Sequence, residues 1–310
     1  MKLGIKVGLR PESVANLVAT KPDFCEIWFH SGKIDQYDDL FRQIKRLGPK
    51  IGLHFWGALA DDTEANLSFP DSLILEASKK LVKKTIETAA RNGCFYVNVH
   101  PGASRLSRID FEAEQVYPYG KQLEVTDCHE SLQASLTELA EFAKNVGVEL
   151  YIESVPRHFL GHPWHGTQGR LKPVVIGQIP VTIIAQILKQ SVANLYFTND
   201  FGHTASNLVT NDRTIIKDGL FTTTRSLATF TKLLHVSYII APYNGTDYHG
   251  CLYYPEVNSS TAVPNHDETK QLLKLFVDRP DVAALVEPET DHVGNFAVLK
   301  TLVTEAQKSA

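Results

Sequence analysis

Histidine, aspartate and glutamate stand at the ends of several short apolar runs in this sequence. The stretch YVNVHPGA, from Tyr96 to Ala103, is one example: an alternating run with β-branched residues finishes on His100 and then turns at Pro-Gly. Five further runs carry such a residue at or near their C-terminal ends: His54, Glu153, Asp200, His235 and Glu287. Neutral imidazole and carboxylate are the ligands that Zn, Mn and Fe take in mixed nitrogen and oxygen sites.

Taken singly, each of these residues has a simpler explanation. A lone His or Glu near a strand end is commonly a surface group or a hydrogen-bonded one. If all six converge, however, their carboxylates repel one another or retain protons unless a cation offsets the charge. Convergence therefore predicts a metal site, and one that holds more than one ion.

Two short pairs extend this set. In NDFGHTASN, His203 follows Asp200 by three residues, so one turn beyond a strand end can direct both side chains the same way. In YNGTDYHG, Asp247 and His249 are two residues apart, which places both on one side of an extended segment. The alternative for this second pair is a simple turn, in which Asp is common. Three histidines of the segment PRHFLGHPWHG, which follows the run ending at Glu153, are expected to contact substrate or to make hydrogen bonds rather than to bind metal: His158, His162 and His165.

The elements that must position these residues alternate along the chain. Short runs rich in Val, Ile, Leu, Phe and Tyr alternate with longer segments of helical period, which is the pattern of βα units. Two helices are clear, one from Ser72 to a stop at Gly93 and one from His129 to a stop at Gly147. The eight predicted strands begin at Lys2, Phe24, Ile51, Cys94, Glu149, Asn194, Leu233 and Val282.

Eight such units in 310 residues predict an α/β fold, a (β/α)8 TIM barrel that forms a single domain over residues 1–310. In these barrels the reactive groups sit at the C-terminal ends of the strands, where the loops form one mouth. The third to eighth strands would each deliver one His, Asp or Glu there. The alternative is a doubly wound open sheet, but the first βα turn has no GxGxxG, so no dinucleotide is implied.

Composition limits the classes of protein further. The chain is 43% hydrophobic and 21% charged, which suits a globular enzyme with a large core. No run of about eighteen uncharged apolar residues occurs, and the N-terminus has no apolar leader segment, so we expect a cytoplasmic protein that makes no membrane contact. A formal charge of −4 gives no overall basic footprint for a polyanion. The cysteines form no CxxC pair and are expected to be reduced and structural: Cys25, Cys94, Cys128 and Cys251.

Several of these segments resemble the endonuclease IV branch (AP endonuclease family 2) of the xylose isomerase-like TIM barrels. They are IGLHFWG, NVHPGA, YIES, NDFGH, LLHVS, DYH and LVEPE, and they span strands three to eight. The resemblance implies nine ligands around three divalent ions, usually zinc, with manganese as the alternative metal. By position, the first ion would take His54, His100 and Glu153, the second Glu153, Asp200, His235 and Glu287, and the third His203, Asp247 and His249.

Such a cluster supports hydrolysis of phosphoesters, and the resemblance implies DNA repair with abasic DNA as the leading substrate. Two close ions lower the pKa of a bridging water, while a third neutralises phosphoryl oxygens and the leaving alkoxide. Glu153 would bridge two ions, and Glu287 would also orient the attacking water. These two carboxylates are the predicted catalytic residues.

The sequence departs from that branch where DNA would be held. The branch has a loop with Arg and Trp after its second strand, whereas the matching loop here, HSGKIDQYDDL, offers only Lys33. Insertions after the fourth and fifth strands also alter the mouth. Duplex binding requires several basic contacts to phosphates, and the candidates are few: Lys33, Arg105, Arg108, Arg157 and Arg170.

A second function class therefore stands beside the hydrolase. It is a sugar or sugar phosphate isomerase or epimerase, in which one divalent ion is held by Glu153, Asp200, His235 and Glu287 and polarises a ketose. The two glutamates of this set exchange protons with the substrate. An isomerase needs only one ion and would not require the five remaining candidate ligands, so their presence favours the hydrolase. These five are His54, His100, His203, Asp247 and His249. A barrel that only binds ligands is a third class, but it has little need for so many metal ligands.

Overall fold

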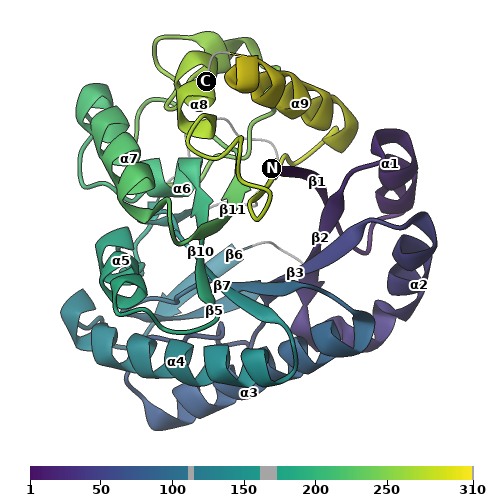
Figure 1. Ribbon diagram of the computed structural model, residues 1–310. Coiled ribbons are helices and arrows are strands. Elements are labelled where there is room, and N and C mark those ends of the chain that lie inside the picture. The colour runs from purple at the N-terminus through teal and green to yellow at the C-terminus, as the bar shows by residue number, and fades with distance from the viewer. Residues whose placement is uncertain (111–114, 161–172, 309–310) are drawn as a thin grey trace.

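Eight parallel strands close into a barrel in the computed structural model, which describes residues 1–110, 115–160 and 173–308. Around the barrel the order is β1-β12-β11-β10-β7-β4-β3-β2, and every neighbouring pair is parallel. Figure 1 shows the helices on the outside of this barrel. The predicted (β/α)8 fold is confirmed.

Each barrel strand overlaps one of the eight predicted runs. The runs are apolar on both faces because one face packs inside the barrel and the other packs under the helices. The barrel strands are β1 (Lys2–Val7), β2 (Phe24–His30), β3 (Lys50–Trp56), β4 (Tyr96–Val99), β7 (Glu149–Glu153), β10 (Leu195–Asp200), β11 (Thr231–His235) and β12 (Ala283–Leu285).

Both helices that the sequence marked clearly are present. The longer one, α3, begins where the Asp71 carboxylate accepts hydrogen bonds from two backbone N–H groups and ends at Gly93, whose φ of 72° is left-handed. The helices are α1 (Glu12–Thr20), α2 (Asp38–Leu47), α3 (Ser72–Asn92), α4 (His129–Asn145), α5 (Val181–Lys189), α6 (Phe201–Ser206), α7 (Arg213–Leu227), α8 (His266–Leu273) and α9 (His292–Lys308), with 3-10 turns η1 (Ser31–Gln36), η2 (Val125–Cys128) and η3 (Pro255–Asn258).

Aromatic and aliphatic side chains fill the barrel beneath its mouth. Tyr96 and Tyr151 stack with ring centroids 4.5 Å apart, and both are buried. Tyr151 lies two residues before Glu153, and Leu233 lies two residues before His235, so each shares a strand face with a candidate ligand. The candidate site therefore rests on a packed apolar layer.

The two insertions that follow β4 and β7 form small antiparallel pairs that the sequence patterns did not predict. The first is a hairpin of β5 (Leu106–Asp110) and β6 (Gln115–Tyr119), and the second pairs β8 (Phe159–Leu160) with β9 (Pro173–Val174). His162, His165 and Arg170 lie outside the described residues.

The four cysteines are buried and unpaired, as expected of structural thiols. Among the helices of the described ranges, none has the length and apolar character needed to cross a bilayer.

Candidate metal centre

The six residues predicted at strand ends lie at one mouth of the barrel. Their strands are consecutive around the barrel, in the order β3, β4, β7, β10, β11 and β12. Parallel strands present their C-terminal ends to the same side, so side chains at these ends converge. Glu153, Asp200 and His235 are the last residues of β7, β10 and β11. His54 lies within β3, His100 directly follows β4, and Glu287 lies two residues beyond β12.

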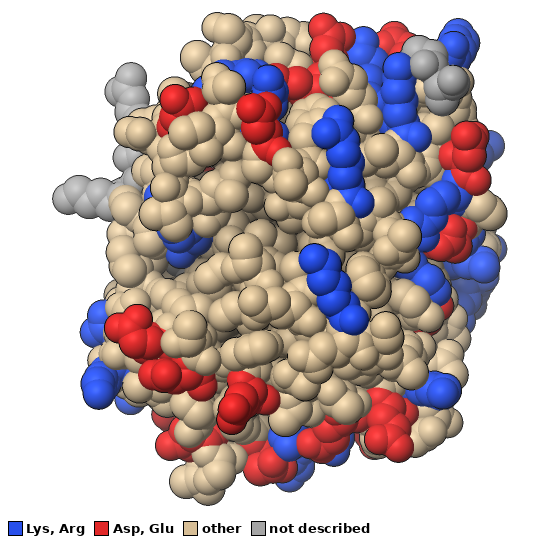
Figure 2. Space-filling view, turned by 60° about the vertical axis from the view of Figure 1, so that its left-hand side comes forward, with Lys and Arg blue, Asp and Glu red and all other residues tan. Residues whose placement is uncertain are grey.

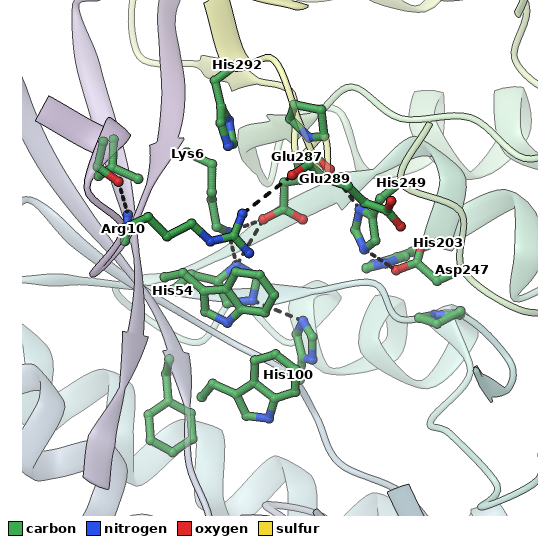
Figure 3. Close-up of a pocket in the computed structure, with 18 of the residues that line it drawn as sticks. Lys6, Arg10, His54, His100, His203, Asp247, His249, Glu287, Glu289 and His292 are labelled. Atoms are coloured by element: carbon green, nitrogen blue, oxygen red, sulfur yellow. Dashed lines mark hydrogen bonds and ion pairs between the residues drawn. The ribbon is translucent and has the colours of Figure 1, made fainter. Parts of the chain in front are cut away.

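The nine candidate ligands fall into three groups whose ligand atoms lie within 4.8 Å of one another. These are the same three sets that the resemblance implied. We call them the first group (His54, His100 and Glu153), the second group (Glu153, Asp200, His235 and Glu287) and the third group (His203, Asp247 and His249). Figure 3 shows the third group beside Glu287 and close to His54 and His100.

In the first group, two imidazoles face one carboxylate. The Nε2 atoms of His54 and His100 are 3.1 Å apart and lie 3.5 Å and 3.6 Å from Glu153 Oε2. The Asn98 amide donates a hydrogen bond to the same Glu153 oxygen and fixes its position. A cation between these atoms would receive two nitrogen ligands and one oxygen ligand.

The second group gathers three carboxylates around one imidazole nitrogen. His235 Nδ1 lies 3.1 Å from Glu153 Oε1, 3.3 Å from Glu287 Oε2 and 3.9 Å from an Asp200 oxygen. The other Asp200 oxygen, Oδ1, accepts hydrogen bonds from the His203 backbone N–H and from Ser237 Oγ. These bonds hold Asp200 at the start of α6.

The third group is oriented by two backbone carbonyls. His203 Nδ1 lies 2.8 Å from the Ser154 carbonyl and His249 Nδ1 lies 2.9 Å from the Glu287 carbonyl. A carbonyl only accepts, so each Nδ1 carries a proton, and each Nε2 would offer its lone pair to an ion once the proton shared with Asp247 is displaced. Both Nε2 atoms face Asp247 Oδ2, at 3.1 Å and 2.5 Å. Metal-binding histidines are commonly held in this way.

The electrostatics of the site favour a cation. Burial alone would raise the pKa of Glu153 and Glu287, but His235 and other neighbouring positive groups hold both far below their usual range. Burial opposes charge on His203 too, yet Asp200 and Asp247 raise its pKa well above normal, and Asp247 helps to raise the pKa of His249 to about 9. The carboxylates thus create a negative potential that protons and metal ions compete to neutralise.

Several buried atoms of the site make no hydrogen bond within the described residues. They are Asp200 Oδ2, His203 Nε2 and His235 Nε2. The two Nε2 atoms lie 3.1 Å from Asp247 Oδ2 and Glu26 Oε1, respectively, without the geometry of a hydrogen bond, and buried polar atoms in this state are accounted for by an ion or a proton between the groups. The donor set, the lone-pair directions and these atoms all fit divalent cations.

Sequence reasoning missed two charged residues of the same mouth, Lys6 and Glu26. Lys6 lies on β1 and is 6% exposed, and its Nζ is 2.6 Å from Glu26 Oε1 on β2. Lys6 also contacts Glu287. A signal was present, because each residue is the one charged position inside an otherwise apolar run, GIKVGL and FCEIWFH.

A pocket opens over the groups. Its wall includes Trp28 and Trp56, whose rings stack 5.0 Å apart at an interplanar angle of 6°. Arg10 and Glu64 also line it, and Figure 3 shows the Arg10 side chain reaching across the site toward Glu287 and Glu289. Burial raises the pKa of Glu64 to about 7, although Ser107 Oγ donates a hydrogen bond to it.

Three of the basic residues proposed to hold DNA contact the protein itself. Arg105 donates to the Tyr119 carbonyl, Arg108 lies over the Tyr119 ring and Arg157 donates to the Leu208 carbonyl. On the face that Figure 2 shows, Lys and Arg side chains stand singly near the centre, and the other described Lys and Arg side chains are interspersed with Asp and Glu toward the edges.

Fold and site together define a (β/α)8 barrel with clustered His and carboxylate side chains at the C-terminal mouth. The chain belongs to the xylose isomerase-like TIM barrel family, whose sequence profile matches residues 14–171. A comparison with curated protein sequences gives no significant match.

Solved structures of similar fold include sugar epimerases. A D-tagatose 3-epimerase-like protein has a TM-score of 0.67 at 17% identity and covers 100% of this chain and 99% of its own. D-psicose 3-epimerase from Clostridium cellulolyticum, solved with D-tagatose, has a TM-score of 0.59 at 16% identity, with 100% and 96% coverage. A protein from Thermus thermophilus, soaked with ZnCl2, has a TM-score of 0.61 at 18% identity, with 98% and 99% coverage. These likenesses show the fold, and they do not confirm the endonuclease IV branch.

Proposed function

We propose that this protein is a metal-dependent isomerase or epimerase of a small sugar. The observation that carries the proposal is the second group, in which Glu153 and Glu287 approach the same nitrogen of His235 within one buried cluster under a pocket. Asp200 and His235 complete a set of four ligands for one ion, with zinc and manganese as the candidate metals. A bound divalent ion would polarise the carbonyl group of a ketose.

The two glutamates would move the proton. Both are ionised at neutral pH, because His235 holds the pKa of each well below its usual range. One carboxylate takes a proton from the carbon beside the carbonyl and later releases it to water, while the other first takes a proton from water and then returns it to the opposite face of that carbon. No proton is gained or lost overall, so the reaction needs no further reagent. Asn98 and Lys6 hold the two carboxylates in place during the exchange.

The pocket supports a small substrate. The stacked Trp28 and Trp56 rings offer an apolar wall, and Arg10, Glu64 and Gln178 offer polar groups around it. This combination of an apolar surface with a few polar groups is typical of small-molecule sites. Epimerases of ketoses among the structures of similar fold agree with this substrate class.

Proton exchange with solvent tests the proposal without knowledge of the product. Protein loaded with Mn²⁺ or Zn²⁺ is incubated in D₂O with D-tagatose, D-fructose, L-ribulose and their phosphates, and deuterium at the carbon beside the carbonyl is followed by NMR. We expect incorporation by the wild type and none by Glu153→Gln or Glu287→Gln, because an amide cannot accept the proton. Glu141→Gln, on the exposed face of α4, is the matched control. Absence of exchange and of epimerisation across this set would reject the proposal.

A metal-dependent phosphoester hydrolase is the second candidate, and a specific observation favours it. The first and third groups would be unnecessary in an enzyme that uses one ion, yet all their ligand atoms converge. The expected substrate is then abasic DNA or a smaller phosphoester. A duplex oligonucleotide with one abasic site, assayed at low salt where phosphate contacts are strongest, should be nicked on its 5′ side by the wild type and not by Glu287→Gln. Nicking without proton exchange would establish this second candidate.

A further inference from the structure

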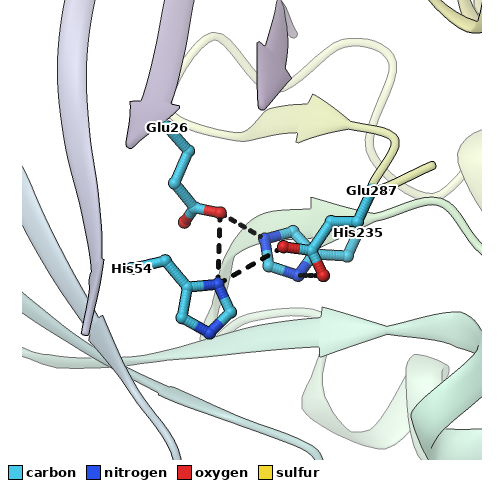
Figure 4. Close-up of side chains that lie close together, drawn as sticks. All are labelled: Glu26, His54, His235 and Glu287. Atoms are coloured by element: carbon cyan, nitrogen blue, oxygen red, sulfur yellow. Dashed lines mark ion pairs between the residues drawn. The ribbon is translucent and has the colours of Figure 1, made fainter. Parts of the chain in front are cut away.

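A fourth set of ligand-type side chains lies at the same mouth: Glu26, His54, His235 and Glu287. Glu26 Oε1 is 3.4 Å from His54 Nδ1 and 3.1 Å from His235 Nε2, and Glu287 Oε1 is 3.3 Å from His54 Nδ1 (Figure 4). These are not the atoms that the other groups share, since the first group uses His54 Nε2 and the second uses His235 Nδ1 and Glu287 Oε2. We call this set the fourth group.

The ammonium of Lys6 lies among the same atoms. Its Nζ is 2.6 Å from Glu26 Oε1 and 2.5 Å from His54 Nδ1, and it contacts Glu287 Oε1. A zinc ion bound by these residues would lie about 2.0–2.2 Å from the same oxygen and nitrogen atoms. The ammonium and an ion therefore exclude one another from the fourth group.

Charge explains why a cation is needed there. Glu26 is fully buried, and Glu287 is nearly so, and two buried carboxylates are stable only with compensating charge and hydrogen bonds. Lys6 supplies the charge, and Tyr96 Oη donates a hydrogen bond to the second Glu26 oxygen at 3.0 Å. Lys6 Nζ contacts both carboxylates directly, so its positive charge lies between the two negative charges that it offsets.

We propose that Lys6 is a built-in cation that fills the fourth group and keeps metal ions out of it. Lys6 holds Oε1 of Glu287, which leaves Oε2 turned toward His235 Nδ1 in the second group. Glu26 faces Nε2 of the same imidazole and leaves Nδ1 available. Lys6 is thus a positioning residue for Glu287 and, through Glu26, for His235. This inference rests on the metal centre of the proposed function.

Metal position, rather than activity, tests the inference. Crystals of the wild type, Lys6→Ala and Lys6→Met are soaked with Mn²⁺, and the ions are located by anomalous scattering. Lys6→Ala removes the charge and opens the space, so we expect an added Mn²⁺ beside Glu26. Lys6→Met removes the charge but fills the space with a chain of similar length, so we expect no ion there. The double variant Lys6→Ala/Glu26→Gln should lose the added ion, because an amide is a weaker ligand than a carboxylate.

A second measurement keeps the inference testable if Lys6→Ala does not fold. At saturating Mn²⁺ or Zn²⁺, Glu26→Gln should bind as many ions per chain as the wild type, measured by elemental analysis, because Glu26 pairs with Lys6 and not with an ion. A loss of one ion per chain in that variant would overturn the inference.

The outcomes separate this inference from the proposed function. An ion beside Glu26 in the wild type, or none there in a folded Lys6→Ala protein that binds metal elsewhere, would overturn the role of Lys6 alone. No ion at any of the four groups in the wild type would instead reject the metal centre and the proposed function with it.

Discussion

At the residue scale, one hydrogen bond to a backbone carbonyl orients each of the two histidines of the third group. Nδ1 of His203 donates a hydrogen bond to the Ser154 carbonyl and Nδ1 of His249 donates one to the Glu287 carbonyl, so Nε2 of both rings is turned toward Asp247. The third group is therefore arranged before any ion arrives, and its three residues come from only two segments of chain. Removing a ligand of the third group should therefore affect metal binding at the other two groups least.

His203→Ala tests this separation. We expect the variant to bind one ion fewer per chain than the wild type and to lose about ten- to a hundred-fold or more in affinity for that ion, because a nitrogen ligand is removed. Elemental analysis after dialysis against Zn²⁺ gives the count. His158→Ala, in the neighbouring loop but outside the three groups, is the control and should keep the wild-type count. Loss of every ion in His203→Ala would show that the groups are not independent.

Glu64 should make stability depend on pH. Burial raises its pKa from 4.5 to about 7, so folding favours the protonated form. Its stabilising contribution is complete below about pH 4.5 and is lost as pH rises to about 7, where the folded state must bury a charge. Between pH 4.5 and pH 8 we therefore expect the unfolding free energy of Glu64→Gln to rise, relative to that of the wild type, by at most about 3 kcal/mol.

Urea unfolding at pH 5 and pH 8 measures this difference. Asp110 and the other acids of the surface contribute equally to both proteins, so the comparison isolates Glu64. The exposed Glu141→Gln variant is the control and should follow the wild type at both pH values. If the unfolding free energies of the wild type and Glu64→Gln changed by the same amount between the two pH values, the expectation would be wrong.

At the scale of elements, the strands place an apolar layer directly beneath the charged one. Tyr96 on β4 joins the two layers, since its ring stacks on Tyr151 and its hydroxyl donates to Glu26. The ring fits only because β3 carries a glycine beside it. A Cβ on Gly52 would lie 2.1 Å from Tyr96 Cζ.

Gly52→Ala should therefore destabilise the barrel and, by displacing the Tyr96 ring, also weaken the hydrogen bond from Tyr96 to Glu26. Overpacking of a filled core typically costs about 1–3 kcal/mol, and we expect a loss of at least that size in urea unfolding. Gly8→Ala is the control, because a Cβ there meets nothing within 4 Å. A Gly52→Ala protein as stable as the wild type would show that Tyr96 can move aside.

At the scale of the whole molecule, the candidate ligands tie the barrel together across its mouth. The nine residues come from β3, β7, β10 and β11, from α6, and from the segments that follow β4, β11 and β12. Ions bound there would link segments far apart in the sequence, and they would bind the folded chain only. Binding to the folded state alone raises stability in proportion to the logarithm of ion concentration.

Metal removal should accordingly lower the thermal midpoint. At a free ion concentration about a hundred times the Kd, one site contributes about 2.7 kcal/mol, so EDTA should lower Tm by several degrees and added Zn²⁺ should restore it. Scanning calorimetry of the wild type and Glu153→Gln gives the comparison, since Glu153 belongs to two groups. An identical Tm with and without EDTA would argue against bound ions.

The sequence by itself determined the eight strands and the nine candidate ligands. Both rest on local information: apolar runs of strand length, and a His, Asp or Glu near the end of the third to eighth runs or in a short spaced pair. Parallel strands then bring their ends to one side in any closed barrel, so convergence at the mouth follows without knowledge of register.

Only the tertiary structure decided which atoms meet. Lys6 and Glu26 lie 20 residues apart, and the contact of Lys6 with Glu287 spans 281 residues, because β1 closes the barrel against β12. The hairpin of β5 and β6 likewise pairs with a distant segment, through a bridge between Arg108 and Thr63. Local patterns carry no information on such contacts, because they depend on barrel closure, on strand register and on the direction in which each side chain leaves its strand.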